Sequence, residues 1–275
     1  MGHMNDCPEG KEMTTYVMGR TPEEYQRLRR QAAVWEPATA RLLDRAGLAP
    51  GARCLDVGCG PGETMRLMAQ RVGPTGRVVG LDVDIRLGAA AAEHSGGEFV
   101  AADVTTDDDA VPAGGFDLVY GRLILLHTPD PVAVLRRMWR WTAPGGVLIV
   151  QDYDMRTVDG YPAHDLVAEW RRVFLGAYAA AGRDVRLGLR LPAMFEEAGI
   201  GAPDGTDVAG ILGTMADSAG MLAATYRSIA PVAIAQGLID EAQRDRFQAE
   251  MAEAAERHPE YTALWPLLIG AWRRR

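Results

Sequence analysis

The sequence predicts an α/β fold built around a mostly parallel β-sheet, on three observations. Between residues 53 and 151, five apolar runs typical of buried strands alternate with helical stretches. Residues 54–62, Cys-Leu-Asp-Val-Gly-Cys-Gly-Pro-Gly, form the first of these runs and a glycine turn that opens a helix. An aspartate lies at the carboxyl end of each of the first three runs, where α/β sheets bind their ligands.

The glycine turn predicts a loop that approaches a ligand closely. Gly58, Gly60 and Gly62 permit positive φ and expose bare backbone. Pro61 suits the first position of the following helix, whose free N–H groups would point at the occupant of the turn. A tight turn between strand and helix without any ligand is the alternative interpretation.

The spacing of the glycines distinguishes between cofactors. Dinucleotide-binding turns follow G-x-G-x-x-G, whereas this turn is G-x-G-x-G with Glu63 in place of the third glycine. A carboxylate there would face pyrophosphate at close range, and Asp56 adds a second negative charge before the turn. These acids favour a ligand with cationic groups, such as S-adenosylmethionine with its sulfonium and ammonium.

Two further aspartates suit the nucleoside part of such a ligand. Asp82 ends the second run about 20 residues beyond the last glycine, where a carboxylate can accept hydrogen bonds from both ribose hydroxyls. Asp103 ends the third run and could accept from an adenine amino group while the Val104 N–H donates to a ring nitrogen. Each aspartate alone could be a helix cap, but three in succession favour a nucleoside site.

With these motifs the chain resembles a class I S-adenosylmethionine-dependent methyltransferase over residues 15–155. Residues 116–120, Phe-Asp-Leu-Val-Tyr, resemble the fourth strand of that family. Residues 126–131 resemble the "LH-x-PDP" element of its small-molecule, specialised-metabolism branch, and residues 144–148 resemble the "PGG" turn into the fifth strand. These motifs are specific for the cofactor and the fold, and not for the substrate.

The resemblance implies a Rossmann-like, seven-stranded, mostly parallel sheet sandwiched by helices, with S-adenosylmethionine as the cofactor. It assigns the methionine part to Gly58 and Gly60, the ribose to Asp82, and the adenine to Asp103 and Val104. The remaining expected cofactor residues are Tyr16, Gln31, Asp56, Val83, Gly121 and Arg122. Arg122 could instead steer an anionic substrate or lie on the surface, and Tyr16 could simply pack on the core.

Four segments are expected in the chain. Residues 1–48 form an N-terminal helical segment over the cofactor site, with a helix from Thr21 to about Asp44 that is broken near Pro37. Residues 49–210 form the cofactor-binding core. Residues 211–260, with helices at 214–236 and 240–257, form a substrate lid inserted before the last strand, which lies within residues 261–275.

Composition excludes several classes of function. The net charge of −8 and pI near 5.2 offer no electrostatic footprint for nucleic acid. No apolar run approaches the ~20 residues of a membrane span, so a cytoplasmic location is expected. Lys11 is the only lysine, an arginine bias typical of a GC-rich bacterial genome. The arginines grouped at 27–30 and 136–140 are interpreted as solvated helix faces. A homo-oligomer is left open.

No metal site is expected. The three cysteines, Cys7, Cys54 and Cys59, lack metal-ligand spacing and suit a reducing compartment. The run Asp107-Asp108-Asp109 could be mistaken for a metal site. Adjacent carboxylates on a loop point different ways, so this run is interpreted as solvated.

Methyl transfer is an in-line displacement at the sulfonium carbon, and much of its rate comes from holding nucleophile and methyl together in a dry pocket. If the acceptor must lose a proton, His127 is the best-placed base, since an unperturbed pKa near 6.5 suits neutral pH. A helix cap or a cofactor contact is the alternative role. Candidate substrate-pocket residues, each of which could instead be core, are Tyr153, Trp170, Tyr178, Met221 and Tyr226.

Missing motifs narrow the acceptor. No Asn/Asp-Pro-Pro-Tyr follows the fourth strand, where residues 120–123 read Tyr-Gly-Arg-Leu, which counts against DNA bases and protein glutamine. No glutamate pair is placed to bracket a protein arginine. The expected function is methyl transfer to O, N or C of a small molecule in bacterial natural-product biosynthesis.

Three alternatives stay open. The first is C-methylation of a prenyl or aromatic substrate, with a carbocation sheltered by a lid that contains methionine and aromatic residues. The second is a cofactor-binding module without catalysis. The third, a nicotinamide-dependent dehydrogenase, is opposed by the missing third glycine.

Overall fold

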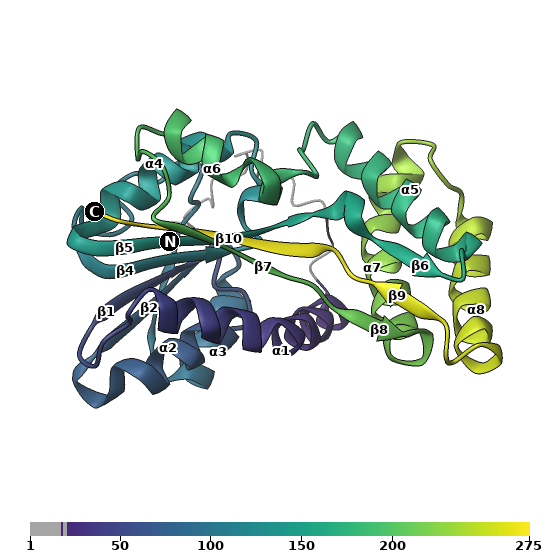
Figure 1. Ribbon diagram of the computed structural model, residues 1–275, viewed down its shortest axis with the longest axis horizontal. Helices are drawn as coiled ribbons and strands as arrows, with labels where there is room; N and C mark the ends of the chain where they lie inside the picture. Colours follow the sequence, from purple (N-terminus) through teal and green to yellow (C-terminus); the bar gives the residue numbers. More distant parts are fainter. Residues whose placement is uncertain (1–17, 19–20) are drawn as a thin grey trace, which may run out of the picture.

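A seven-stranded sheet forms the centre of the molecule, and the computed structural model describes Met18 and residues 21–275 (Figure 1). The strand order is β3-β2-β1-β4-β5-β10-β7. β10 runs antiparallel to both its neighbours, and the pairs among the first five strands are parallel. This arrangement confirms the predicted fold class. The strands are β1 (Arg53–Val57), β2 (Arg77–Asp82), β3 (Glu98–Ala101), β4 (Phe116–Arg122), β5 (Thr142–Asp154), β7 (Gly205–Ala209) and β10 (Leu267–Arg274).

Helices cover both faces of this sheet (Figure 1). One face carries α1 (Pro22–Arg45), α2 (Glu63–Val72) and α3 (Ile85–Ser95), and the other carries α4 (Pro131–Trp141) and α6 (Leu187–Glu197). Short 3-10 turns follow α2, β4 and β5, at η1 (Gly73–Thr75), η2 (Leu125–His127) and η3 (Met155–Thr157). The carboxyl ends of the parallel strands therefore open between two helical layers, which is where the site lies.

α1 begins where the sequence predicts and ends within one residue of the predicted Asp44. The Thr21 side chain accepts a hydrogen bond from the Glu24 N–H at 3.2 Å, and Pro22 occupies the first turn. The expected break at Pro37 is wrong, because the helix continues through it to Arg45. Trp35 and several apolar side chains beyond Pro37 are buried on one face, and this packing outweighs the local penalty of about 3 kcal/mol for an internal proline.

The turn before α2 also differs from the prediction. The helix begins at Glu63, so Pro61 precedes it and does not occupy its first position. Gly62 is the N-cap in the left-handed conformation, with φ of 83°. A Cβ added to Gly62 would lie 2.7 Å from the Cβ of Ala91, so the close approach of α3 also requires glycine here.

A second group of elements lies beyond the carboxyl ends of the strands, and we call it the cap (Figure 1). It consists of the helices α5 (Asp165–Ala180), α7 (Met215–Ala235) and α8 (Glu241–Arg257) and the small antiparallel sheet β6-β9-β8. The strands of that sheet are β6 (Asp159–Tyr161), β8 (Leu212–Thr214) and β9 (Thr262–Leu264).

The two helices expected in the lid are present within one or two residues of their predicted bounds. α5 and β6 belong to the cap although the sequence places them in the core segment 49–210. The stretch expected as one last strand is divided, because residues 262–264 pair in the cap sheet and β10 begins at Leu267. The division of the chain into domains stays a prediction. No helix in the described part of the chain is long and apolar enough to cross a bilayer.

Candidate active site

A cavity lies at the carboxyl ends of the strands, lined by residues of the glycine turn, α1 and the cap. A smaller hollow adjoins it near the end of β3, and five residues including His127 line both. Most of the predicted cofactor residues come together here. Gln31, Asp56, Gly58, Gly60, Asp82, Val83 and Arg122 line the cavity, and Asp103 and Val104 line the hollow.

The glycine turn presents open backbone to the cavity. Gly58 and Gly60 have φ of 68° and 50°, a backbone conformation that residues other than glycine rarely adopt. A Cβ added to Gly60 would meet no atom within 4 Å, so its missing side chain leaves space on the cavity side. The Gly60 N–H donates to Asp82 Oδ2 at 2.9 Å, which holds the turn against the end of β2.

Asp56 is a buried carboxylate with an unmet hydrogen bond. Its side chain lies in the cavity wall, only 2% of the residue is exposed, and Oδ2 has no hydrogen-bond partner. Burial raises the pKa of Asp56 to about 7, although the positive charge of Arg122 opposes this rise. A buried acceptor without a partner is costly, so the site fits a ligand that brings a cationic donor.

Asp82 lies at the junction of the cavity and the hollow. Its two carboxylate oxygens accept from the N–H groups of Gly60 and Asp84, both at 2.9 Å, and burial raises its pKa. The Tyr25 hydroxyl donates to Asp84 Oδ2 at 2.6 Å, which ties α1 to the end of β2. Both residues line the cavity, and no sequence motif predicted this contact.

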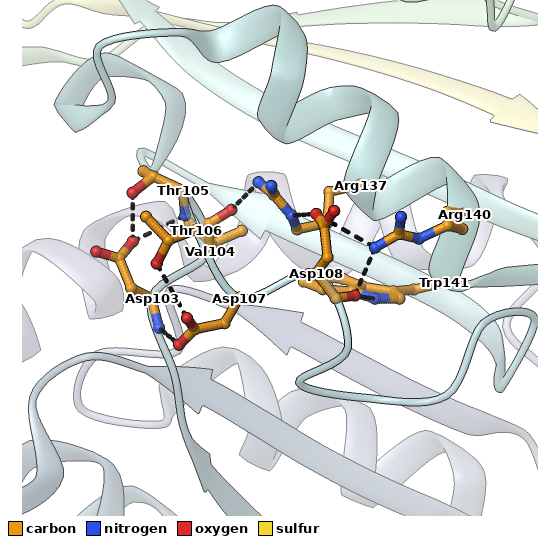
Figure 2. A network of polar contacts seen from close by, with 9 residues as sticks. All are labelled: Asp103, Val104, Thr105, Thr106, Asp107, Asp108, Arg137, Arg140 and Trp141. Carbon is orange, nitrogen blue, oxygen red and sulfur yellow. Dashed lines mark hydrogen bonds and ion pairs between the residues drawn. The ribbon is translucent and has the colours of Figure 1, made fainter.

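The loop after β3 holds Asp103 in a fixed orientation (Figure 2). Asp103 Oδ1 accepts from the Thr105 N–H at 2.8 Å and from the Thr105 hydroxyl at 2.6 Å. The Asp103 N–H donates to Asp107 Oδ2 at 2.8 Å. Asp107 therefore stabilises the loop by a hydrogen bond within it, whereas the sequence analysis predicted a solvated side chain.

Helix α4 holds the other side of the same loop (Figure 2). Arg137 donates to the Val104 carbonyl and to Asp108 Oδ1, and Arg140 donates to the Asp108 carbonyl at 2.5 Å. The Arg137 side chain is only 11% exposed. The interpretation as a solvated face is therefore wrong for Arg137, which neutralises an acidic loop, whereas Arg136 is exposed and the Arg140 side chain is 42% exposed. Within residues 21–275 and Met18, no group of three or more His, Cys, Asp or Glu side chains could hold a metal ion.

Arg27 was also interpreted as part of a solvated helix face, and this prediction is wrong. It is 4% exposed, lines the cavity, and pairs with Glu24 through two bonds of 2.7 and 2.8 Å. It also donates to Gln31 Oε1 at 3.1 Å, and the Ser228 hydroxyl of α7 donates to Glu24. The spacing of Glu24, Arg27 and Gln31 places them on one face of α1, and this pattern could have predicted their contacts from the sequence.

Tyr153, one of the predicted substrate residues, lies in the cavity wall with its hydroxyl fixed from α1. Gln31 Nε2 and Trp35 Nε1 donate to this hydroxyl at 2.9 and 2.5 Å. The bonds place the predicted cofactor residue Gln31 beside the predicted substrate residue Tyr153. The two expected regions therefore share a wall.

His127, the predicted base, lies in η2 and faces both the cavity and the hollow. Its Nδ1 is 3.4 Å from the Tyr178 hydroxyl. Burial lowers the pKa of His127 to about 3, and the positive charges of Arg27 and Arg183 lower it further. The imidazole is therefore neutral at physiological pH and a much weaker base than the sequence suggested.

The part of the cavity next to the cap is largely apolar. Of the predicted substrate residues, Trp170, Tyr178 and Met221 line it together with Tyr153. The sequence interpretation missed the wall residues Met155, Val158, Phe174 and Trp265. Phe174 lies four residues from both Trp170 and Tyr178, so helical spacing on α5 was a usable signal for it.

Two predicted site residues have packing roles instead. Tyr226 faces the inside of the cap, where its ring stacks on Phe247 with centroids 3.7 Å apart and its hydroxyl donates to Glu169. Gly121 lies within β4, where an added Cβ would meet Met138 Cε at 2.9 Å. Among the described residues, neither lines the cavity or the hollow. Tyr16, the last predicted contact, lies outside the described residues.

The open glycine turn, the unpartnered Asp56 oxygen and the aspartates at successive strand ends suit a nucleoside with a cationic amino-acid tail. On this fold, they define the site of an S-adenosylmethionine-dependent methyltransferase. The methyltransferase domain family matches residues 25–199, more than half of the chain. The chain therefore belongs to that family, within the class I S-adenosylmethionine-dependent methyltransferases.

The relatives with known functions are named for several different methyl acceptors. Phosphoethanolamine N-methyltransferase 3 of Arabidopsis thaliana is 37% identical over 120 residues, 42% of this chain and 24% of that protein. Nocamycin O-methyltransferase of Saccharothrix syringae is 40% identical over 116 residues, 41% of each chain. Trans-aconitate 2-methyltransferase of Methylobacterium radiotolerans is 37% identical over 161 residues, 58% of each chain. Each match spans less than two thirds of the relative.

Solved structures share the fold at low sequence identity. Protein BH2331 of Bacillus halodurans has a TM-score of 0.56 and 16% identity, covering 86% of this chain and 97% of that one. Phosphoethanolamine N-methyltransferase 2 of Haemonchus contortus, solved with S-adenosylhomocysteine, has a TM-score of 0.50 and 16% identity. That match covers 86% of this chain and 52% of the other. At these identities the likeness concerns the fold alone.

Proposed function

We propose that this chain transfers a methyl group from S-adenosylmethionine to O, N or C of a small-molecule acceptor held in the apolar part of the cavity. One observation carries the proposal. His127 faces both the hollow at the predicted nucleoside residues and the cavity that continues to the cap wall. Cofactor and acceptor would therefore meet in one enclosed space, which favours displacement by proximity and by exclusion of water.

Residues of this chain would bind the cofactor at three points. Asp56 would take the cationic end, Asp82 the ribose, and the loop at Asp103 the adenine. The bound cofactor supplies an electrophilic methyl group on a sulfonium. The bare backbone at Gly58 and Gly60 allows the cofactor to approach the turn closely.

His127 would position the nucleophile of the acceptor rather than activate it beforehand. A phenol-like hydroxyl has a pKa of about 10, far above the lowered pKa of His127, so deprotonation of the acceptor before methyl transfer would be strongly unfavourable. The neutral imidazole can accept a hydrogen bond from that hydroxyl. It can accept the proton only as methyl transfer makes the acceptor oxygen strongly acidic.

Three observations support an acceptor from bacterial natural-product metabolism. The wall next to the cap is built from Trp170, Phe174, Met221 and Leu222, which suits a molecule with a large apolar body. Among the relatives, Nocamycin O-methyltransferase has the highest of the identities given above. The arginine-rich composition is consistent with a bacterial source.

The proposal is tested with methyl-labelled S-adenosylmethionine and a small-molecule extract of a GC-rich bacterium. The expected result is label in a small molecule when the wild-type protein is present, and much less label with Asp82→Ala at a cofactor concentration that saturates only the wild type. Calorimetry with the same proteins measures cofactor binding separately. Binding of S-adenosylmethionine without a labelled product from any extract would favour a cofactor-binding module without catalysis. Binding of NAD instead would support the dehydrogenase alternative.

A further inference from the structure

Three aromatic side chains of α5 form a stacked row along the cavity wall, and we call them the aromatic ladder: Trp170, Phe174 and Tyr178. They are spaced four residues apart, so they lie on successive turns of one helix face. The ring centroids of Trp170 and Phe174 are 4.9 Å apart with planes at 18°, and those of Phe174 and Tyr178 are 4.5 Å apart at 14°. All three rings line the cavity, and none of the three residues is more than 4% exposed.

The stacking determines which part of the middle ring an occupant meets. Trp170 and Tyr178 lie on opposite sides of Phe174 along the helix, so they cover both faces of its ring. Phe174 therefore contributes its edge to the cavity wall. The face of an aromatic ring carries partial negative charge and its edge carries partial positive charge. An occupant beside Phe174 is thus in contact with weakly positive C–H groups.

The polar atoms of this wall are bonded within the protein. Trp170 Nε1 donates to the Leu222 carbonyl at 3.1 Å, and Trp265 Nε1 donates to the Ser218 hydroxyl at 3.1 Å. The Thr225 hydroxyl donates to the carbonyl one turn before it, at 2.8 Å. The body of the acceptor would therefore be held by packing, and its polar end would lie near His127, which also faces the hollow.

We infer that the acceptor has a planar, electron-rich aromatic body whose ring face packs against the exposed edge of Phe174 in the aromatic ladder. This inference rests on the proposed function and specifies its acceptor class. A carbocation is attracted to ring faces and repelled by ring edges, so the ladder does not suit carbocation chemistry on a prenyl chain. One edge-to-face pair changes affinity by about two- to tenfold.

The test uses the full chain saturated with S-adenosylhomocysteine and three probes, measured by calorimetry. The probes are 2-naphthol, its saturated counterpart decahydro-2-naphthol, and the prenyl alcohol geraniol. We expect 2-naphthol to bind at least about three times more tightly than either of the others. Transfer from water alone would not favour the aromatic compound, because the saturated compound is at least as apolar.

Variants separate the ring edge from general packing. Phe174→Leu keeps an apolar side chain but removes the aromatic ring edge. The variant should therefore bind 2-naphthol and the two other probes almost equally. Phe174→Met is a second variant in case the first does not fold, and unchanged S-adenosylhomocysteine binding reports folding in both. Phe247→Leu is the matched control, since it removes a stacked ring of the cap that does not line the cavity. It should keep the preference.

Three results would overturn the inference: equal binding of all probes, tightest binding of geraniol, or an unchanged preference in a folded Phe174 variant. No binding of any probe would also overturn it, since the apolar wall would then not hold an acceptor body. None of these experiments requires methyl transfer. Failure of the proposed function would instead appear as cofactor binding without a labelled product.

Discussion

Replacing Asp56 by asparagine should weaken binding of S-adenosylmethionine and remove its dependence on pH. The side chain is fully buried in the cavity wall, and its unpartnered Oδ2 provides an acceptor for a cationic donor. Asp56→Asn keeps the shape and an acceptor oxygen but loses the charge. A hydrogen bond to a charged group contributes about 1.5–3 kcal/mol, so affinity at pH 8 should fall roughly 10- to 150-fold.

The sign of the pH effect follows from the raised pKa of Asp56. In the free protein this pKa is about 7, and a bound cation lowers it. Binding therefore releases a proton below pH 7, and the affinity of the wild type should fall about tenfold for each pH unit below 7. The amino group of the cofactor stays protonated there, since an α-amino pKa is about 8. The variant should bind equally well from pH 5 to pH 7.

The stability of the protein without cofactor should fall as the pH rises, whereas its affinity for the cofactor should increase. Because the pKa of Asp56 is about 7 in the folded state and 3.8 as its reference value, the folded state binds more protons between these values. The stability that protonation of Asp56 contributes is therefore fully present below about pH 4 and is lost as the pH rises to 7. Asp56→Asn lacks this loss and should be more stable at pH 8, by about 2–4 kcal/mol.

Calorimetry in two buffers of different ionisation enthalpy measures the affinity and the released protons, and chemical unfolding measures stability. Asp207→Asn is the matched control, because it removes a buried carboxylate that pairs with Arg41 and Arg45 and does not line the cavity. It should lower stability and leave cofactor affinity unchanged. A wild-type affinity that is flat from pH 5 to pH 8, or an unchanged affinity in Asp56→Asn at pH 8, would refute the reasoning.

Four further predictions concern other residues of the site and the cap. Asp82→Ala should lose about 2 kcal/mol or more of cofactor affinity by calorimetry while remaining folded, and an unchanged affinity would limit Asp82 to its bonds within the loop. Met221→Ala should change acceptor turnover at unchanged cofactor affinity. Tyr226→Ala should instead lower unfolding stability by about 3 kcal/mol or more, because the stacked ring lies inside the cap. Turnover measured at saturating cofactor should show no titration of His127 between pH 5 and pH 8, and a step near pH 6.5 would contradict its lowered pKa.

The parts of the fold that the sequence predicted correctly are those with strong local rules. The turn at Gly58 and Gly60 needs positive φ, and the acids at the ends of β1 and β2 mark one edge of a parallel sheet. Each rule acts within a few residues of the chain. The same short range explains the error at Pro37, since the burial of Trp35 and the residues after it is a tertiary effect that overrides a local preference.

The acceptor side was harder to predict because its wall combines segments far apart in the sequence. Phe174 lies on α5, Met221 on α7 and Trp265 between β9 and β10, and no local motif brings them together. Helical spacing of apolar residues predicts a buried face without telling a cavity wall from a packed core. Tyr226 illustrates this ambiguity, since it lies on α7 only five residues after Met221 but faces α8.

Charged residues buried between α1 and the cap show how the two halves of the site depend on one another. Arg27 was expected in solvent, yet it lies in the cavity wall with its charge balanced by Glu24, which also accepts from Ser228 of α7. The pair keeps the buried charge of Glu24 balanced, and the hydrogen bond from Ser228 to Glu24 holds α7 against α1. The helix that covers the cofactor region therefore also fixes one wall of the acceptor region. This shared wall gives a physical reason for closing both ligands into the same cavity, since residues of α1 and of the cap line it together and a dry pocket favours methyl transfer.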